Sequence, residues 1–320
     1  MEIKALIADS GLLGKALSGN IDDYPDGIVI PVDKPYRWTS ADVIRKLKWA
    51  ACRHFGKRNL KVGHAGTLDP LATGVLLVCV GKATRLAETL QKEGKEYVAG
   101  IAFGATTPSY DLEKAVDKLY PTDYVSEKTI LEALPEFLGE REQVAPLFSA
   151  KSVDGVRAYE LARRQYKEKG KAKSDVLEDF DHSVAEALNV QRIHIHELEL
   201  LDFTPASAGG AVSPGHAQPQ RSEDGRGRDS AAPRRPDVDL NLESGPGSRI
   251  NVADTSGLNL PVATIRIACG KGTYIRAFAR DLGEALGSGA HLCSLRRTKS
   301  GGFVAETALS VPQALELFST

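Results

Sequence analysis

Apolar and polar positions along the chain follow two different periods, and this mixture predicts a single α+β domain. Residues 75–80 form an uninterrupted apolar run, which is typical of a strand buried on both faces. Residues 190–203 alternate between polar and apolar side chains, which is typical of a half-buried strand. Further segments with strand character lie at 27–31, 97–103 and 262–268.

Helical spacing of apolar residues predicts helices between these strands. One helix follows Thr39 and Ser40, either of which can serve as its N-cap. A second covers 130–137, and a third begins at Tyr159. The last begins at Tyr274, and Thr273 is its candidate cap.

Residues 205–249 have the composition of a disordered segment. They contain seven Gly, six Pro, six Ser and no aromatic residue, so they cannot bury enough apolar surface to offset their chain entropy. Because strands are predicted on both sides, we interpret the segment as an enlarged hairpin connection, which costs little closure entropy. We therefore expect an N-terminal extension at 1–26, one domain formed by 27–203 and 257–320, and a disordered insertion at 204–256.

Net charge and cysteine spacing exclude several classes of protein. The 41 basic and 42 acidic residues exclude a globally basic protein of histone or ribosomal type. The chain has no run of 18 apolar residues and no signal-peptide pattern, so we expect a cytoplasmic protein. Its four cysteines form no C-x-x-C pair, which argues against a zinc site and a disulfide framework.

Two neighbouring segments are candidates for function. Residues 61–76 contain three glycines, a proline and two threonines before the predicted strand, so we expect His64 and Asp69 to lie on an irregular loop. A turn initiated by Asp69 and Pro70 explains the same composition about equally well. Residues 45–61 contain seven Lys or Arg and no acid, with aromatic residues interleaved, a pattern typical of RNA binding.

Common catalytic motifs are missing from the sequence. It contains no G-x-x-x-x-G-K-[ST], no G-x-S-x-G and no H-E-x-x-H. A phosphotransferase of the P-loop type, a serine hydrolase and a zincin are therefore poorly supported.

The segment GHAGTLDPLATGVL at 63–76 closely resembles the signature of the TruB family of tRNA pseudouridine-55 synthases. Further stretches match that family in order and spacing: DKP at 33–35, WTS at 38–40, KEY at 95–97, QVAPLFSA at 143–150, GVRAY at 155–159, GKGTYIR at 270–276, GAH at 289–291 and LRR at 295–297. The resemblance spans residues 27–310 apart from the predicted insertion. It implies an α+β pseudouridine synthase catalytic fold with a mixed, largely antiparallel central sheet flanked by helices.

The resemblance implies that Asp69 is the catalytic carboxylate and that Arg276 is its cationic partner. A carboxylate can act as nucleophile and then as leaving group, or can stabilise positive charge on the sugar. An arginine can hold it with two parallel hydrogen bonds. Without the motif, Arg276 is better explained as a surface arginine paired on its own helix.

By the same resemblance, four further residues bind the substrate. Tyr97 stacks on the flipped uracil, and His64 enters the RNA loop where that base was. Tyr274 and Leu295 line the pocket. Core packing competes as an explanation for these two residues and for Tyr97 on its strand, and a hydrogen bond to backbone competes for His64. The substrate is the T arm of tRNA, no cofactor or metal is required, and a monomer is the default expectation.

Two departures from the family pattern change these expectations. Arg37 stands where the family usually has glycine, so a tight turn is expected to be reshaped there. Most family members also continue into a small RNA-binding PUA domain, whereas this sequence stops at Thr320. We expect a short form without that domain, with weaker and more salt-sensitive tRNA binding.

Three alternatives remain open from the sequence. The catalytic subunit of a guide-RNA pseudouridylation particle shares the core motif, although such subunits use a PUA domain to hold the guide. A tRNA-binding or tRNA-folding module without turnover is a second alternative. A glycosidase that uses Asp69 requires a second carboxylate as general acid, and residues 63–76 offer none.

Overall fold

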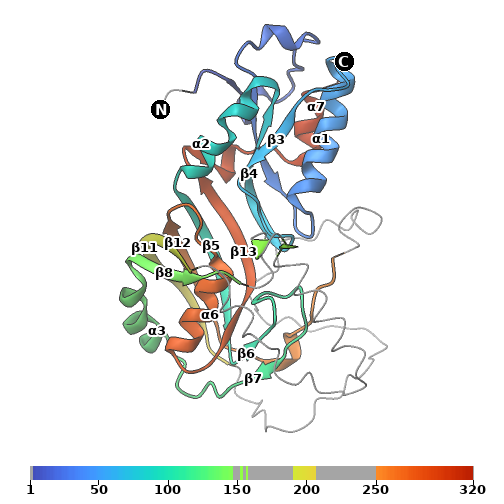
Figure 1. The fold of residues 1–320 in the computed structure, drawn as a ribbon. Helices are drawn as coiled ribbons and strands as arrows, with labels where there is room; N and C mark the ends of the chain where they lie inside the picture. The colour runs from blue at the N-terminus through green and yellow to red at the C-terminus, as the bar shows by residue number, and fades with distance from the viewer. Residues whose placement is uncertain (1–2, 147–151, 154–155, 158–189, 207–249, 320) are drawn as a thin grey trace, which may run out of the picture.

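The computed structural model of the protein describes residues 3–146, 152–153, 156–157, 190–206 and 250–319 (Figure 1). The helix predicted from Tyr159 and most of the predicted insertion lie outside these residues.

One large sheet organises the described part of the chain. Its strand order is β1 (Leu6–Ile7), β2 (Ile28–Lys34), β4 (Ala72–Val80), β13 (Ala290–Ser300), β5 (Lys95–Phe103), β12 (Val262–Cys269), β11 (Val190–Thr204) and β8 (Gly139–Val144). In addition, β3 (Val62–Ala65) pairs with β4, and β14 (Phe303–Val304) pairs with β13. The pairs β1–β2 and β4–β13 are parallel and the other pairs are antiparallel. The predicted α+β fold with a mixed, largely antiparallel sheet is thus confirmed.

Strand β4 lies at the centre of two hydrophobic cores. Its residues Leu76, Val78 and Val80 face the larger core, and Leu77 and Cys79 face the smaller one. All nine residues of β4 are buried. This two-sided burial explains why the sequence shows a continuous apolar run instead of alternation.

Strands β11 and β12 form the predicted long antiparallel hairpin, in which Thr204 pairs with Val262. The last residues of the predicted insertion, 250–256, belong to the described part of the chain. The carbonyl of Ile250 accepts a hydrogen bond from Arg37 at 2.8 Å, and Ala253 donates one to the carbonyl of Leu112 at 2.7 Å. The domain boundaries stay a prediction.

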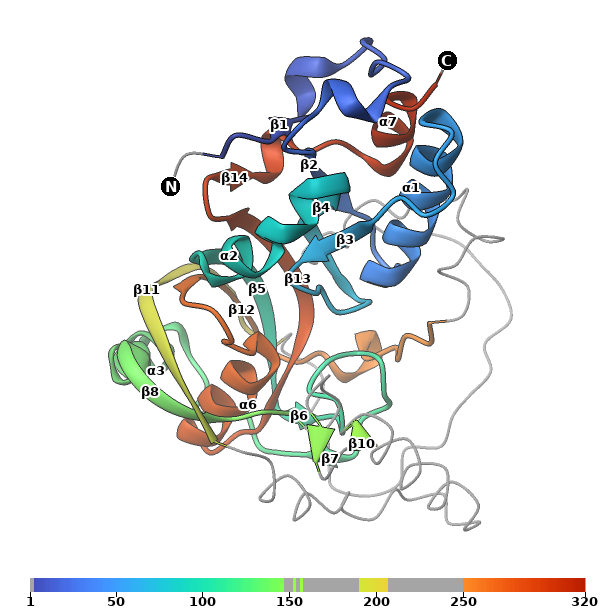
Figure 2. The same cartoon turned by 45° about the horizontal axis from the view of Figure 1, so that its top comes forward.

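Helices cover the sheet at both ends (Figures 1 and 2). The α1 helix (Ser40–His54) and the α7 helix (Val311–Glu316) lie together at the end that carries both termini. The α6 helix (Ile275–Ala285) packs on β13 towards the other end, near α3 (Glu127–Ala133). The short α2 helix (Ala87–Lys92) contacts β3. None of the helices in the described ranges is long and apolar enough to cross a membrane.

The first and second predicted helices show how local chemistry sets helix ends. Thr39, one of the two candidate caps, is the N-cap of α1, and the structure adds a capping box between it and Asp42. The helix predicted at 130–137 is only partly correct, because the α-helix ends at Ala133 and a 3₁₀ turn continues over Leu134–Phe137. Pro135 cannot continue the hydrogen-bond ladder of the preceding turn.

Short elements complete the described fold. The remaining strands are β6 (Ala105–Thr106), β7 (Lys118–Leu119), β9 (Ser152–Val153) and β10 (Val156–Arg157). The remaining 3₁₀ turns are Ser10–Leu12, Ile21–Asp23, Gly81–Leu86, Ser256–Leu258 and Ala305–Thr307.

One edge of β4 is shared by two strands, which pair with different parts of it and then diverge. β3 pairs with the end of β4 at residues 77–80, and β13 pairs with its beginning at residues 72–74. The loop at residues 66–71 leaves the sheet where these two strands diverge (Figure 2). Residues from β4, β13 and this loop therefore come together at the middle of the molecule.

Candidate active site

Asp69 lies on the loop between β3 and β4, as the sequence predicted, at a turn closed by a 3.1 Å hydrogen bond from the Ala72 amide to the Asp69 carbonyl. The prediction that His64 lies on the same loop is wrong. His64 pairs with Val78 inside β3, because the irregular segment begins only at Gly66. The glycine in front of His64 therefore did not interrupt the strand.

Arg276 enters the site from the first turn of α6 and pairs with Asp69. Its Nε donates to one carboxylate oxygen at 2.9 Å, and its Nη2 donates to the other at 3.1 Å. A third donor, Nη1, binds the carbonyl of Ser109 at 3.1 Å. The Arg276 side chain is only 6% exposed, whereas that of Asp69 is 37% exposed. A buried cation thus holds a carboxylate that still reaches solvent, and the explanation of Arg276 as a surface residue is wrong.

The first turn of α6 is held from outside the helix. Tyr274, not Thr273, is the N-cap residue, and its side chain makes no capping bond. Instead, the Gln143 side chain accepts from the Tyr274 amide at 2.9 Å and donates to its carbonyl at 3.2 Å. Gln143 comes from β8, so a strand distant in sequence fixes the helix turn that carries Arg276. Thr273 donates to the carbonyl of Gly270 at 3.1 Å.

A second carboxylate, Asp111, belongs to the same site and was missed from the sequence. It lies 3.9 Å from Arg276 Nε and accepts a 2.6 Å hydrogen bond from the Ser109 hydroxyl. Asp111 is a partner of Arg276 and comes from a loop after β6. The motif around Asp69 therefore could not indicate it. Residues 63–76 contain no second carboxylate for a glycosidase. The folded site does contain one, because Asp111 lies beside Arg276.

A cavity joins these groups. Among the predicted site residues, Asp69, Arg276 and Leu295 line it together, whereas His64, Tyr97 and Tyr274 do not. Its lining consists of Asp69, Leu71, Ala72, Asp111, Leu112, Arg276, Leu292, Cys293, Ser294 and Leu295. Three of the lining residues are charged, and most of the others are apolar.

Two residues outside the loop hold the Asp69 turn. The Lys34 ammonium donates to the carbonyls of Trp38 at 2.6 Å, Pro35 at 3.0 Å and Pro70 at 3.2 Å. The Ser40 hydroxyl donates to the Leu68 carbonyl at 3.1 Å and accepts from the Leu68 amide at 2.9 Å. Both sides of Asp69 are therefore fixed to β2 and to the start of α1.

The turn between β2 and α1 has a left-handed residue at Arg37. Arg37 has a φ of 63°, which lies in the region that glycine adopts most easily. Whether the turn is reshaped relative to the glycine form stays a prediction.

Burial and neighbouring charges shift the pKa values of the groups around Asp69. Burial lowers the pKa of Lys34 to about 7, although Asp69 and Asp33 oppose the change. Burial raises the pKa of Asp111, and Arg276 works against that rise. Burial also disfavours the charged form of Arg276, yet its two carboxylate partners raise its pKa above the ordinary value.

The predicted substrate-binding residues occupy different environments. Tyr97 on β5 is buried in the larger core, and burial raises the pKa of its phenol. His64 is partly buried, and burial lowers the pKa of its imidazole. Leu295 on β13 packs against the larger core from the cavity side. Tyr274 is half-buried at the start of α6.

The basic segment predicted to bind RNA forms the outer face of α1 and the loop that follows it. Trp49 is 66% exposed, and the Arg53 guanidinium lies 5.6 Å from its ring centroid. Arg45 pairs with Asp42 and Lys57 pairs with Asp22, whereas the other five basic residues of 45–61 form no ion pair with a described residue. This face therefore presents uncompensated positive charge beside an accessible aromatic ring.

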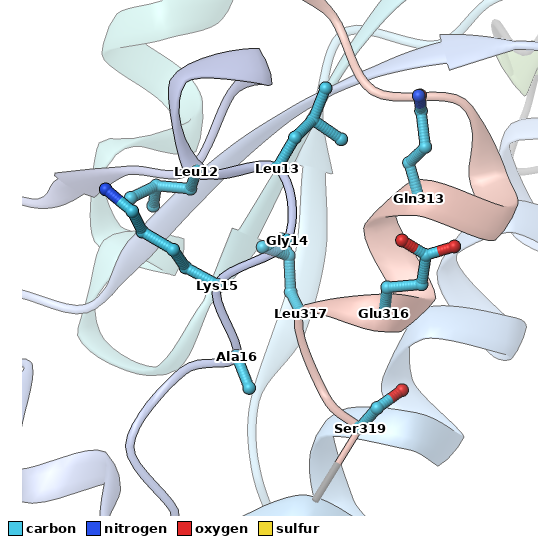
Figure 3. A pocket seen from close by; sticks show the side chains of 9 residues that line it. All are labelled: Leu12, Leu13, Gly14, Lys15, Ala16, Gln313, Glu316, Leu317 and Ser319. Carbon is cyan, nitrogen blue, oxygen red and sulfur yellow. The ribbon is translucent and has the colours of Figure 1, made fainter.

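A second cavity lies between the N-terminal segment and α7 (Figure 3). Its lining residues are Leu12, Leu13, Gly14, Lys15, Ala16, Gln313, Glu316, Leu317 and Ser319. None of the predicted site residues lines it. Within the described ranges, no three His, Cys, Asp or Glu residues are grouped so as to hold a metal ion.

The chain matches two family models. The first, described as the N-terminal domain of TruB family pseudouridylate synthase, matches residues 53–213, and the second, described as the C-terminal domain of tRNA pseudouridylate synthase B, matches residues 276–317. A solved Cbf5–Nop10–Gar1 complex aligns at 25% identity with a TM-score of 0.49, over 89% of this chain and 52% of the solved chain. The present chain thus spans about half the length of that solved chain.

Two curated relatives align over most of the chain. The tRNA pseudouridine synthase B of Phocaeicola vulgatus is 39% identical over 289 residues, which are 90% of this chain and 92% of the relative. The protein of the same name from Thermus thermophilus is 38% identical over 88% of this chain and 75% of its own length. Identity of this extent over most of the chain places it in the same family as these relatives. The protein belongs to the TruB family of pseudouridylate synthases.

Proposed function

We propose that the protein converts the T-arm uridine at position 55 of tRNA to pseudouridine, with Asp69 as the catalytic carboxylate. The observation that carries this proposal is the Asp69 carboxylate, which reaches the cavity while a buried Arg276 holds both of its oxygens. The names of the relatives from Phocaeicola vulgatus and Thermus thermophilus support tRNA as the substrate.

The proposed reaction breaks the N-glycosidic bond of the uridine, turns the base, and rejoins it to the sugar through carbon. Asp69 acts either as a nucleophile that later leaves, or as the base that removes a ribose proton. In both routes the carboxylate must be ionised and aimed at the sugar or base. The two hydrogen bonds from Arg276 provide this aim, because the guanidinium fork fixes the plane of the carboxylate.

The other predicted residues receive the flipped nucleotide. Tyr97 stacks on the uracil once the nucleotide reaches its ring, which is buried in the free structure. Leu295 provides an apolar wall of the cavity, Tyr274 lies at the helix turn before Arg276, and His64 fills the place of the flipped base in the RNA. No cofactor or metal takes part in these steps as proposed.

The outer face of α1 supports RNA as the partner. Ser40 joins the first turn of α1 to the catalytic loop, so the helix begins next to Asp69. At about 1.5 Å per residue, Trp49 lies roughly 13 Å along the helix from Ser40. The exposed Trp49 and its basic neighbours offer stacking and phosphate contacts, which add affinity for an RNA that wraps around this helix.

The test is to incubate the purified protein with an unmodified tRNA transcript, without guide RNA, nucleotide or added metal, and to map pseudouridine by carbodiimide-adduct primer extension. A transcript with cytidine in place of the T-loop uridine is the matched control. The proposal predicts one stop at the T-loop uridine and none with the control transcript. Measurable tRNA binding without a stop would contradict it and would favour guide-dependent activity or binding without turnover.

A further inference from the structure

Arg297 is a buried cation on β13 that the proposed chemistry does not use. Its side chain is among the largest that are fully buried, with 1% exposure. Among the described residues, no carboxylate forms an ion pair with it. An unpaired buried charge is costly, so the residue calls for a specific explanation.

The guanidinium of Arg297 binds three backbone carbonyls near the point where β3 and β13 diverge along β4. Its Nε donates to Val75 on β4 at 2.7 Å, its Nη2 to Gly66 at 3.1 Å, and its Nη1 to Thr67 at 3.4 Å. Gly66 and Thr67 begin the loop that carries Asp69 two residues later. The rigid fork of arginine can span these acceptors, whereas a lysine ammonium donates from a single atom.

The backbone of Arg297 is fixed as firmly as its side chain. Gly74 has a φ of 99°, and a Cβ atom there would meet the Arg297 carbonyl oxygen at 2.1 Å, so β4 and β13 approach closely only because this residue is glycine. On the other side, Arg297 pairs directly with Tyr97 of β5. The residue therefore joins the strand of Tyr97 to the loop of Asp69.

We propose that Arg297 is a positioning residue, whose guanidinium holds the Gly66 and Thr67 carbonyls and so places the Asp69 turn relative to Tyr97. This inference rests on the proposed function, because it assigns Arg297 to the same site. The charge of Arg297 also reaches the groups around it. It adds to burial in lowering the pKa of His64 and opposes the rise in the pKa of Tyr97.

The first test compares Arg297→Lys with wild type and with Arg266→Lys. Arg266 is a matched control on the same sheet, because it pairs with Glu197 and Glu199 at the surface, away from the cavity. Three quantities are measured: the single-turnover rate of pseudouridine formation at saturating enzyme, the tRNA Kd, and the Tm. Displacing a catalytic group slightly costs up to about 100-fold in rate, so we expect a loss of at least about tenfold for Arg297→Lys with the Kd unchanged, and no loss for Arg266→Lys.

The second test changes the loop side of the contact between Arg297 and Gly66. Gly66 has a φ of 93°, so Gly66→Ala strains the turn and moves the carbonyl that Arg297 binds, without disturbing a core side chain. We expect a loss of rate at unchanged Kd, and no further loss when it is combined with Arg297→Lys. If Arg297→Lys does not fold, the rate of Gly66→Ala tests whether the contact with Arg297 positions the Asp69 turn.

Three results would overturn the proposal: a folded Arg297→Lys that reacts at the wild-type rate, a Gly66→Ala that does so, or rate losses matched by equal losses in tRNA binding. A wild-type protein that forms no pseudouridine would instead refute the proposed function. The two failures are therefore distinguishable.

Discussion

Arg276 binds both carboxylate oxygens of Asp69, at 2.9 and 3.1 Å, although 207 residues separate them in the sequence. The pair joins α6 to the loop between β3 and β4. Because Arg276 is buried and Asp69 is partly exposed, the cation is held by the fold and the carboxylate is presented to the cavity. This arrangement suits a carboxylate that reacts, since its direction is set before the substrate arrives.

Replacing Arg276 by lysine keeps the positive charge but removes the fork that binds both oxygens. We expect the single-turnover rate to fall by about 100-fold, as when one aligned donor is lost from an active site. Rapid-quench measurement at saturating enzyme tests this, with the tRNA Kd as the control. A wild-type rate for Arg276→Lys would show that charge alone is sufficient.

The sequence predicted the strands better than the site. The continuous apolar run of β4 and the alternation of β11 each follow from burial, so the local pattern was informative. The resemblance proposed Asp69 with Arg276, and the fold brings them into contact. Asp111 and Gln143 act through partners more than a hundred residues away, and no local spacing reports such contacts.

His64 and Thr273 depart from the sequence-based expectations for local physical reasons. His64 was placed on a loop because glycine flanks it, yet glycine is tolerated in β3, where it pairs with Cys79. Thr273 was proposed as a cap, but its hydroxyl binds the Gly270 carbonyl instead.

Trp49 provides a test of the RNA surface on α1. Trp49→Ala removes an exposed ring on which a base can stack, a contact that contributes about 1–3 kcal/mol. We expect the tRNA Kd to rise about fivefold or more in a filter-binding titration, with the single-turnover rate at saturating enzyme unchanged. Leu131→Ala is the matched control, because Leu131 on α3 is 50% exposed. Equal effects of the two variants would count against a specific contact at Trp49.

Lys34 predicts a particular dependence of stability on pH. Burial lowers its pKa in the folded protein to about 7, from 10.5 for an ordinary lysine. Between these values the unfolded chain binds one proton more than the folded chain, so stability gains from Lys34 as pH rises from 7 to 10. Urea unfolding of wild type and Lys34→Met isolates this effect, because the other titrating groups are common to both. The free energy of unfolding of wild type, relative to that of Lys34→Met, should rise with pH. A difference between the two that stays constant with pH would refute the lowered pKa of Lys34.

The segment 205–249 is expected to be dispensable for folding and catalysis. Its composition lacks core residues, and its six Arg are matched by six acidic residues. Replacing it with a short Gly/Ser linker should therefore leave the Tm and the rate of pseudouridine formation unchanged. Differential scanning calorimetry and the tRNA assay measure these two quantities. A collapsed Tm would assign the segment a structural role.

The most direct test of the central claim is the single-turnover rate of Asp69→Asn on unmodified tRNA, measured together with its tRNA Kd. The substitution keeps the shape of the side chain and removes only the ionised group. If Asp69 performs the chemistry, no pseudouridine should form at the T-loop uridine, while the Kd stays within about threefold of wild type. A variant that still turns over, or one that loses tRNA binding as completely as activity, would contradict this role of Asp69.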